Sequence, residues 1–133
     1  MTIAHLAYTA LDCDNPIELA DFYSKITGWP VEPLGDYPPA DVTWLELLDD
    51  KGFTKMGFQK IENYQKPTWP TGGLPQQAHI DFHAKDLDIA EKQLLEIGAV
   101  KAEFQPKPHR FRIFLDLAGH PFCIVQSDHA SCH

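Results

Sequence analysis

The sequence has few of the features that mark membrane, disulfide-rich or nucleic-acid-binding proteins. No apolar run approaches the roughly 20 residues that a membrane-spanning helix requires. The three cysteines form no CxxC pair, so a reducing cytoplasm fits better than a disulfide scaffold. Lysine and arginine number 11 against 19 acidic residues, a formal net charge of −8. Because phosphate binding needs clustered basic side chains, we expect no nucleic-acid partner.

The N-terminal residues do not resemble a signal peptide. His5 and Asp12 interrupt their apolar pattern, and no basic segment precedes it. The chain of 133 residues is 44% hydrophobic and 11% aromatic, enough to bury one compact core. We therefore expect a cytoplasmic protein with one domain over residues 1–127 and a polar tail over 128–133. Its acidic surface suits a cationic or neutral small ligand.

The first half of the chain predicts a strand, a helix and three further strands. The strands are expected at 3–11, 29–34, 42–48 and 56–61. Asp14 or Asn15 can cap the helix, with Pro16 at its first position, and Gly28 can end it. One helical face carries apolar side chains at i, i+3, i+4 and i+7, namely Leu19, Phe22, Tyr23 and Ile26.

The same order returns after a connector rich in proline and glycine at 63–76. Strands are expected at 77–84, 100–104, 110–117 and 122–126. Asp86 or Asp88 opens the second helix and Gly98 closes it. The two modules, about 3–62 and 77–127, thus repeat with an offset of about 70 residues. We predict an α+β fold in which two βαβββ modules form a curved mixed sheet around a concave cavity.

This order resembles the glyoxalase-like domain proteins of the vicinal oxygen chelate superfamily, which includes glyoxalase I, extradiol dioxygenases and bleomycin-resistance proteins. The resemblance covers nearly the whole chain. It rests on the segments at 11–13, 15–16, 19–23, 28–29, 57–59, 67–70, 79–81, 87–88, 98–99 and 116–123. Because this fold hosts many reactions, the resemblance implies the fold more strongly than any one activity.

The resemblance implies four inward-facing positions that hold a divalent metal in some relatives. They fall on Tyr8, Gln59, His79 and Cys123, with His5 as an alternative to Tyr8 if the strand register differs. His79 is the one usual ligand, Gln59 is a weak oxygen donor, and Cys123 could bind zinc as a thiolate. The set favours a protein without a resident metal. A bound metal would be held by these four residues.

Polar residues alternate along the first strand of the second module. His79, Asp81 and His83 share one face of this strand. The functional interpretation is a cavity wall with His79 as a catalytic acid, base or ligand. The alternative is a half-exposed strand with its polar residues in solvent. Cys123 is likewise either a ligand or reactive thiol, or a small buried hydrophobe.

Aromatic side chains complete the predicted ligand-binding site. The candidates are Tyr8, Trp44, Phe58, Trp69 and Phe114, and we place the first four in the site with Gln59, Asp81 and Cys123. Most aromatic residues belong to a core, so only some of them should contact a ligand.

Two functions follow from these observations. One is a lyase-like or dioxygenase-type enzyme with a degenerate metal site, acting on a small oxygenated molecule. The other is a metal-free protein that binds or sequesters a small molecule, as bleomycin-resistance relatives do. The resemblance also implies a homodimer.

Overall fold

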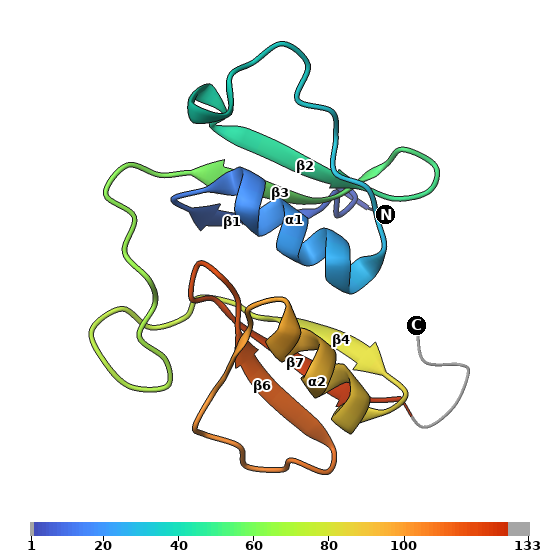
Figure 1. The fold of residues 1–133 in the computed structure, drawn as a ribbon, viewed down its shortest axis with the longest axis vertical. Coiled ribbons are helices and arrows are strands. Elements are labelled where there is room, and N and C mark those ends of the chain that lie inside the picture. Colours follow the sequence, from blue (N-terminus) through green and yellow to red (C-terminus); the bar gives the residue numbers. More distant parts are fainter. Residues whose placement is uncertain (1, 128–133) are drawn as a thin grey trace. The chain divides into compact units, whose positions relative to one another are not determined.

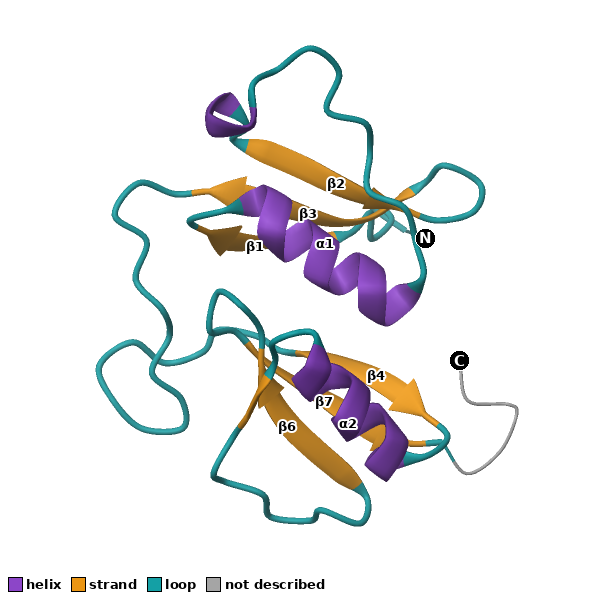
Figure 2. Ribbon diagram, in the orientation of Figure 1, coloured by secondary structure: helices purple, strands orange, loops and turns teal. Residues whose placement is uncertain are grey.

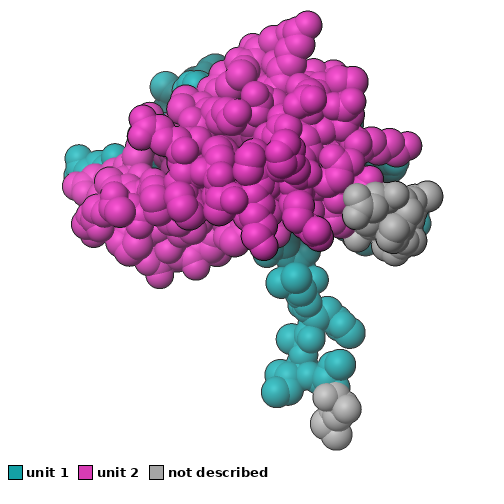
Figure 3. All heavy atoms as spheres, turned by 90° about the horizontal axis from the view of Figure 1, so that it is seen from below, with its two compact units in different colours: residues 1–64 teal, residues 65–133 magenta. Residues whose placement is uncertain are grey.

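The computed structural model describes residues 2–127, and the tail predicted over 128–133 lies outside this range. The chain forms two compact units, Met1–Tyr64 (unit 1) and Gln65–His133 (unit 2), coloured separately in Figure 3. The predicted domain boundaries, with a connector at 63–76, stay a prediction. None of the described helices is long and apolar enough to cross a membrane.

Unit 1 places one helix against a three-stranded sheet (Figure 1). Its elements are β1 (Thr9–Cys13), α1 (Pro16–Thr27), the short 3-10 helix η1 (Pro39–Asp41), β2 (Trp44–Leu48) and β3 (Thr54–Lys60). The sheet order is β1-β3-β2, with β1 parallel to β3 and β2 antiparallel to it. The strand expected at 29–34 is reduced to a single bridge between Val31 and Leu47.

Unit 2 repeats the plan of one helix packed against a sheet (Figure 2), and its sheet has one more strand than that of unit 1. Its elements are β4 (Ile80–Ala84), α2 (Leu87–Glu96), β5 (Val100–Lys101), β6 (Phe111–Leu115) and β7 (Pro121–Gln126). The sheet order is β4-β7-β6-β5, and β4 runs parallel to β7. The α+β class with two βαβββ-like modules is therefore confirmed.

The two helices begin with the same kind of side-chain N-cap. The side chain of Asn15 accepts a hydrogen bond from the amide of Glu18 at 3.2 Å, and that of Asp86 accepts one from the amide of Ile89 at 3.0 Å. Each bond satisfies a backbone N–H that the first helical turn leaves without a partner. The caps fix where the chain leaves each first strand and turns into the helix.

Each unit buries aromatic side chains between its helix and its sheet. In unit 1, Phe58 of β3 is fully buried and stacks on Tyr23 of α1, with ring centroids 5.8 Å apart. In unit 2, Phe122 of β7 stacks on Phe114 at 5.9 Å and meets the ring of Phe82 edge-on at 6.0 Å. Because side chains alternate along a strand, the neighbours of these residues point to the opposite face of each sheet.

The first strand starts later than the sequence indicates. The apolar residues at 3–11 predicted a strand from Ile3, whereas β1 begins at Thr9, which is the first residue paired with β3. Ile3 and Leu6 are almost fully exposed, in the extended N-terminal segment that projects from unit 1 (teal in Figure 3). Local strand-forming composition does not make a strand where no partner strand lies alongside.

Candidate functional site

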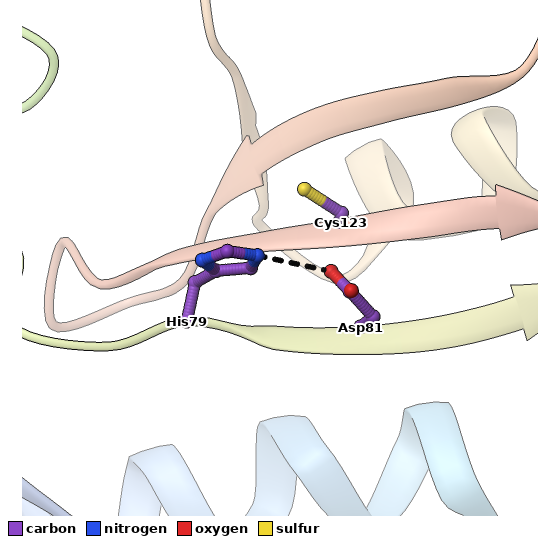
Figure 4. Close-up of side chains that lie close together, drawn as sticks. All are labelled: His79, Asp81 and Cys123. Atoms are coloured by element: carbon purple, nitrogen blue, oxygen red, sulfur yellow. Dashed lines mark ion pairs between the residues drawn. The ribbon is translucent and has the colours of Figure 1, made fainter.

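Three side chains with metal-binding chemistry meet on unit 2. Asp81 of β4 lies directly opposite Cys123 of β7 in the parallel ladder. His79 precedes β4 by one residue and shares the face of Asp81, because strand side chains alternate with period two. The Nε2 atom of His79 lies 3.3 Å from Oδ1 of Asp81, and the ligand atoms of all three residues lie within 4.8 Å of one another (Figure 4).

The carboxylate of Asp81 organises this cluster. Cys123 is half-buried, and its burial, the negative charge of Asp81 and a hydrogen bond to Asp81 raise the thiol pKa from 9.0 to about 11. The thiol is therefore protonated at neutral pH and donates to the carboxylate. The side chains of His79 and Asp81 are about half exposed, so solvent or a small molecule can reach them.

The donor set fits a zinc-class metal. An imidazole, a carboxylate and a cysteine sulfur are all ordinary zinc ligands, and a catalytic zinc takes three protein ligands and keeps one position for water or substrate. The residue pattern alone predicts Asp81 as a ligand-binding residue and not as a metal ligand. Its position two residues after His79 was the available signal, but its pairing with Cys123 depends on strand register.

The equivalent positions of unit 1 carry different chemistry. Counted back from the helix caps, Tyr8 corresponds to His79 and Ala10 to Asp81. Ala10 pairs with Gly57 in the β1–β3 ladder, as Asp81 pairs with Cys123 in unit 2. Gly57 has no side chain, so these three positions of unit 1 cannot form a metal-binding triplet.

The indole of Trp44 fills the space above Gly57. A Cβ atom at Gly57 would lie 2.5 Å from two carbons of that ring. The indole Nε1 donates to Oε2 of Glu46 at 2.9 Å. The ring centroids of Trp44 and Tyr8 lie 6.2 Å apart, and the two ring planes are tilted by 58°. Tyr8 and Trp44, both predicted as site residues, are thus brought together over Gly57.

Gln59 lies beside the Trp44 group, whereas Phe58 and Trp69 lie apart from both groups. Gln59 lies two residues beyond Gly57, between Asp12 of β1 and Trp44 of β2 in the sheet register. Phe58 belongs to the core of unit 1 and points to the helix side. Trp69 packs edge-on against Phe104 in unit 2, at 5.9 Å.

The predicted four-residue metal set draws on both units and stays a prediction. His5, the alternative to Tyr8, is exposed in the N-terminal segment. His83 shares the face of Asp81 on β4 but pairs with Val125, beyond the His79, Asp81 and Cys123 group.

Comparison with known proteins identifies the family. The profile of the Glyoxalase-like domain matches residues 8–125. The chain belongs to the glyoxalase-like domain family. This places the protein in the vicinal oxygen chelate superfamily, and the expectation drawn from the residue pattern is confirmed. No curated protein matches the glyoxalase-like chain significantly.

Solved structures share the fold at low sequence identity. The fosfomycin resistance protein FosX from Mesorhizobium loti is 14% identical over 95% of this chain and 94% of its own, with a TM-score of 0.64. FosX from Listeria monocytogenes, in a mutant complex with manganese(II) and 1S,2S-dihydroxypropylphosphonic acid, is 14% identical over 95% and 94%, with a TM-score of 0.63. A possible glyoxalase from Bacillus cereus is 16% identical over 91% and 97%, with a TM-score of 0.59.

Proposed function

We propose that this protein is a glyoxalase-like enzyme that acts on a small oxygenated molecule at a divalent metal held by unit 2. The ligands are His79, Asp81 and Cys123, and zinc is the metal that suits the soft sulfur donor. The observation that carries this proposal is the approach of three different ligand atoms to within 4.8 Å on one sheet face.

The chain's own residues hold and order this centre. A bound zinc-class ion would supply Lewis-acid polarisation of a substrate oxygen. Cys123 would bind a metal ion as a thiolate, with the thiol proton released to solvent. Before an ion binds, Asp81 orients the imidazole of His79 through their 3.3 Å contact and accepts the hydrogen bond of the Cys123 thiol. The carboxylate therefore fixes both neighbours, and its half-exposed position leaves the group open to a small molecule.

The structural neighbours support the class of reaction. The Listeria FosX complex contains a manganese ion and a small dihydroxy phosphonate in the same fold. An oxygenated small molecule is therefore a sensible substrate class, and a screen should include aldehyde–thiol adducts, catechols and epoxides. Turnover that requires metal and is lost in Asp81→Asn would support the enzyme over a passive binder.

The decisive experiment measures metal binding by calorimetry. The tail carries His129, Cys132 and His133, so these residues are first replaced by alanine or serine. We expect one zinc ion per chain. We expect Cys123→Ser and Asp81→Asn each to weaken binding by at least about 10- to 100-fold, which is the usual cost of losing a residue that only orients a ligand. His83→Gln, on the same strand face, is the matched control and should leave the affinity unchanged.

Two results would contradict the metal centre. One is less than about a tenth of an equivalent of zinc, nickel, manganese or iron after reconstitution. The other is an unchanged zinc affinity in both Cys123→Ser and Asp81→Asn, which would place any bound metal elsewhere.

A metal-free binding protein is the second candidate, and one observation favours it. The Cys123 thiol and Asp81 already satisfy each other through a hydrogen bond, so the cluster is stable without an ion. Chelator-treated protein should then show raised melting temperatures with some members of a broad ligand library. A melting temperature that no compound moves would count against this candidate.

We also propose that the protein is a cytoplasmic homodimer, as the resemblance to the family implies. Light scattering coupled to size-exclusion chromatography tests the dimer directly. A mass of one chain at micromolar concentration would contradict it.

A further inference from the structure

Unit 1 contains a pocket that none of the residues of the proposed metal centre lines. The chain between α1 and the start of β2 bounds a pocket of about 310 Å³. Two aromatic residues and two carboxylates contribute to its lining, namely Tyr37, Trp44, Glu32 and Asp41. Lysine, arginine and histidine are absent from the nine residues that line it.

Trp44 is one of the residues that line this pocket, and its indole is held in place by its neighbours. Its Nε1 donates to Oε2 of Glu46 at 2.9 Å, and Oε1 of Glu46 accepts from the Thr54 hydroxyl at 2.7 Å. The indole also rests on Gly57 and against the ring of Tyr8. An aromatic surface fixed on three sides loses little conformational entropy when a ligand binds to it.

Glu32 is held in place by a reciprocal pair of hydrogen bonds. Its amide donates to the carbonyl of Glu46 at 2.9 Å, and its Oε1 accepts from the amide of Glu46 at 2.8 Å. The negative charge is thereby kept at the pocket. Asp41 brings a second carboxylate at the end of η1, where its amide donates to the carbonyl of Pro38 at 2.9 Å.

We propose that this pocket binds a small organic cation, an alkylated ammonium group. Aromatic faces attract such cations through the negative charge density on the face of the ring. The lining offers two carboxylates and no basic side chain, so a cation meets opposite charge there. The site goes beyond the function proposed above, because it uses none of the metal-centre residues.

Choline and its neutral carbon isostere, 3,3-dimethylbutan-1-ol, provide a matched pair of probes. Calorimetric titration of the full chain should show saturable binding of choline, and at least about tenfold weaker binding of the isostere. The two probes have nearly the same shape, so the difference measures the charge. Equal binding of both, or the absence of saturable choline binding, would overturn the proposal.

Two variants locate the site. The double variant Glu32→Gln/Asp41→Asn keeps an oxygen acceptor for the Glu46 amide, removes both charges, and should weaken choline binding at least about tenfold. The control Asp50→Asn/Glu62→Gln changes two exposed acids outside the pocket and the net charge by the same amount. An equal loss in the control would overturn the proposal in favour of general surface charge.

Single substitutions at exposed positions test the proposal if the double variant does not fold. Asp41→Asn and Tyr37→Leu alter exposed side chains that no core contact requires. Each should weaken choline binding several-fold with an unchanged melting temperature. Choline affinity equal to wild type in both would overturn the proposal.

Discussion

The two units share one plan on the helix side of their sheets and differ on the other side. Both have a side-chain cap before the helix, a parallel pair of strands and a stacked aromatic core. On the opposite face, unit 2 carries His79, Asp81 and Cys123, whereas unit 1 carries Tyr8, Ala10 and Gly57 beneath Trp44. The helix side maintains the fold, and the opposite side is where the units have acquired separate chemistry.

The largest expected effect tests the core on the helix side of each sheet, which the two units share. Phe58→Ala and Phe122→Ala each remove a fully buried aromatic ring, and each should lower the free energy of unfolding by about 3–5 kcal/mol in denaturant titrations. Phe53→Ala, at an exposed position, is the control. If Phe58→Ala weakened ligand binding while stability stayed intact, Phe58 would belong to a site, as the sequence had suggested.

The next effect tests the crowded position of unit 1. Gly57→Ala should lower the free energy of unfolding by about 1–3 kcal/mol, because the new Cβ meets the indole of Trp44. The same change in a Trp44→Ala background should cost clearly less. Gly73→Ala, where a Cβ meets nothing within 4 Å, is the control. An equal cost with and without Trp44 would refute the close approach.

The thiol of unit 2 gives a chemical test. With a pKa of about 11, Cys123 is ionised to only about 1% at pH 9, so alkylation should be slow in metal-free protein. Asp81→Asn removes the charge and the hydrogen bond, and should speed alkylation by about tenfold. Cys132→Ser removes the tail thiol from the assay, and buried Cys13 provides an internal reference. Equal rates in both proteins would show that Asp81 does not act on Cys123.

The same raised pKa predicts a pH dependence of stability. The thiol ionises near pH 9 in the unfolded chain but near pH 11 in the folded one, so the folded state retains the proton that the unfolded state loses. The contribution is complete below pH 9 and is lost as the pH rises from 9 to 11. Cys123→Ser should flatten this part of the stability profile.

The smallest effect compares the two caps. Asn15→Ala and Asp86→Ala should each lower the free energy of unfolding by about 1 kcal/mol, since each removes a partner from one helix amide. Exposed Lys92→Ala is the control, with an expected change below about 0.5 kcal/mol. A large difference between the two variants in the free energy of unfolding would show that the two helices do not stabilise their units equally.

The sequence predicted the order of elements because the signals for them are local. Asn15–Pro16, Asp86 and the apolar helical spacing marked both helices. The β1 boundary was wrong because Ile3 and Leu6 look like strand residues, whereas strand formation depends on β3 as a partner. Phe58 and Gln59 are adjacent in sequence, yet only the sheet shows that the first is core and the second faces the opposite side.

The candidate site was predictable only in part, because local sequence signals do not show which strands lie side by side. His79 and Asp81 share a strand face, which spacing alone indicates. The opposition of Asp81 to Cys123 and the cover of Trp44 over Gly57 join residues that lie 42 and 13 positions apart in the printed sequence. Such contacts follow from strand register, which composition and local periodicity do not encode.

The contact between Trp44 and Gly57 also constrains the routes by which this chain could change. A metal ligand at position 57 would need a side chain in space that the indole already fills. A substitution at position 57 would lower the free energy of unfolding before the new side chain could bind a metal. A metal ligand at position 57 would thus require Trp44, which also lines the neighbouring pocket, to move or be replaced.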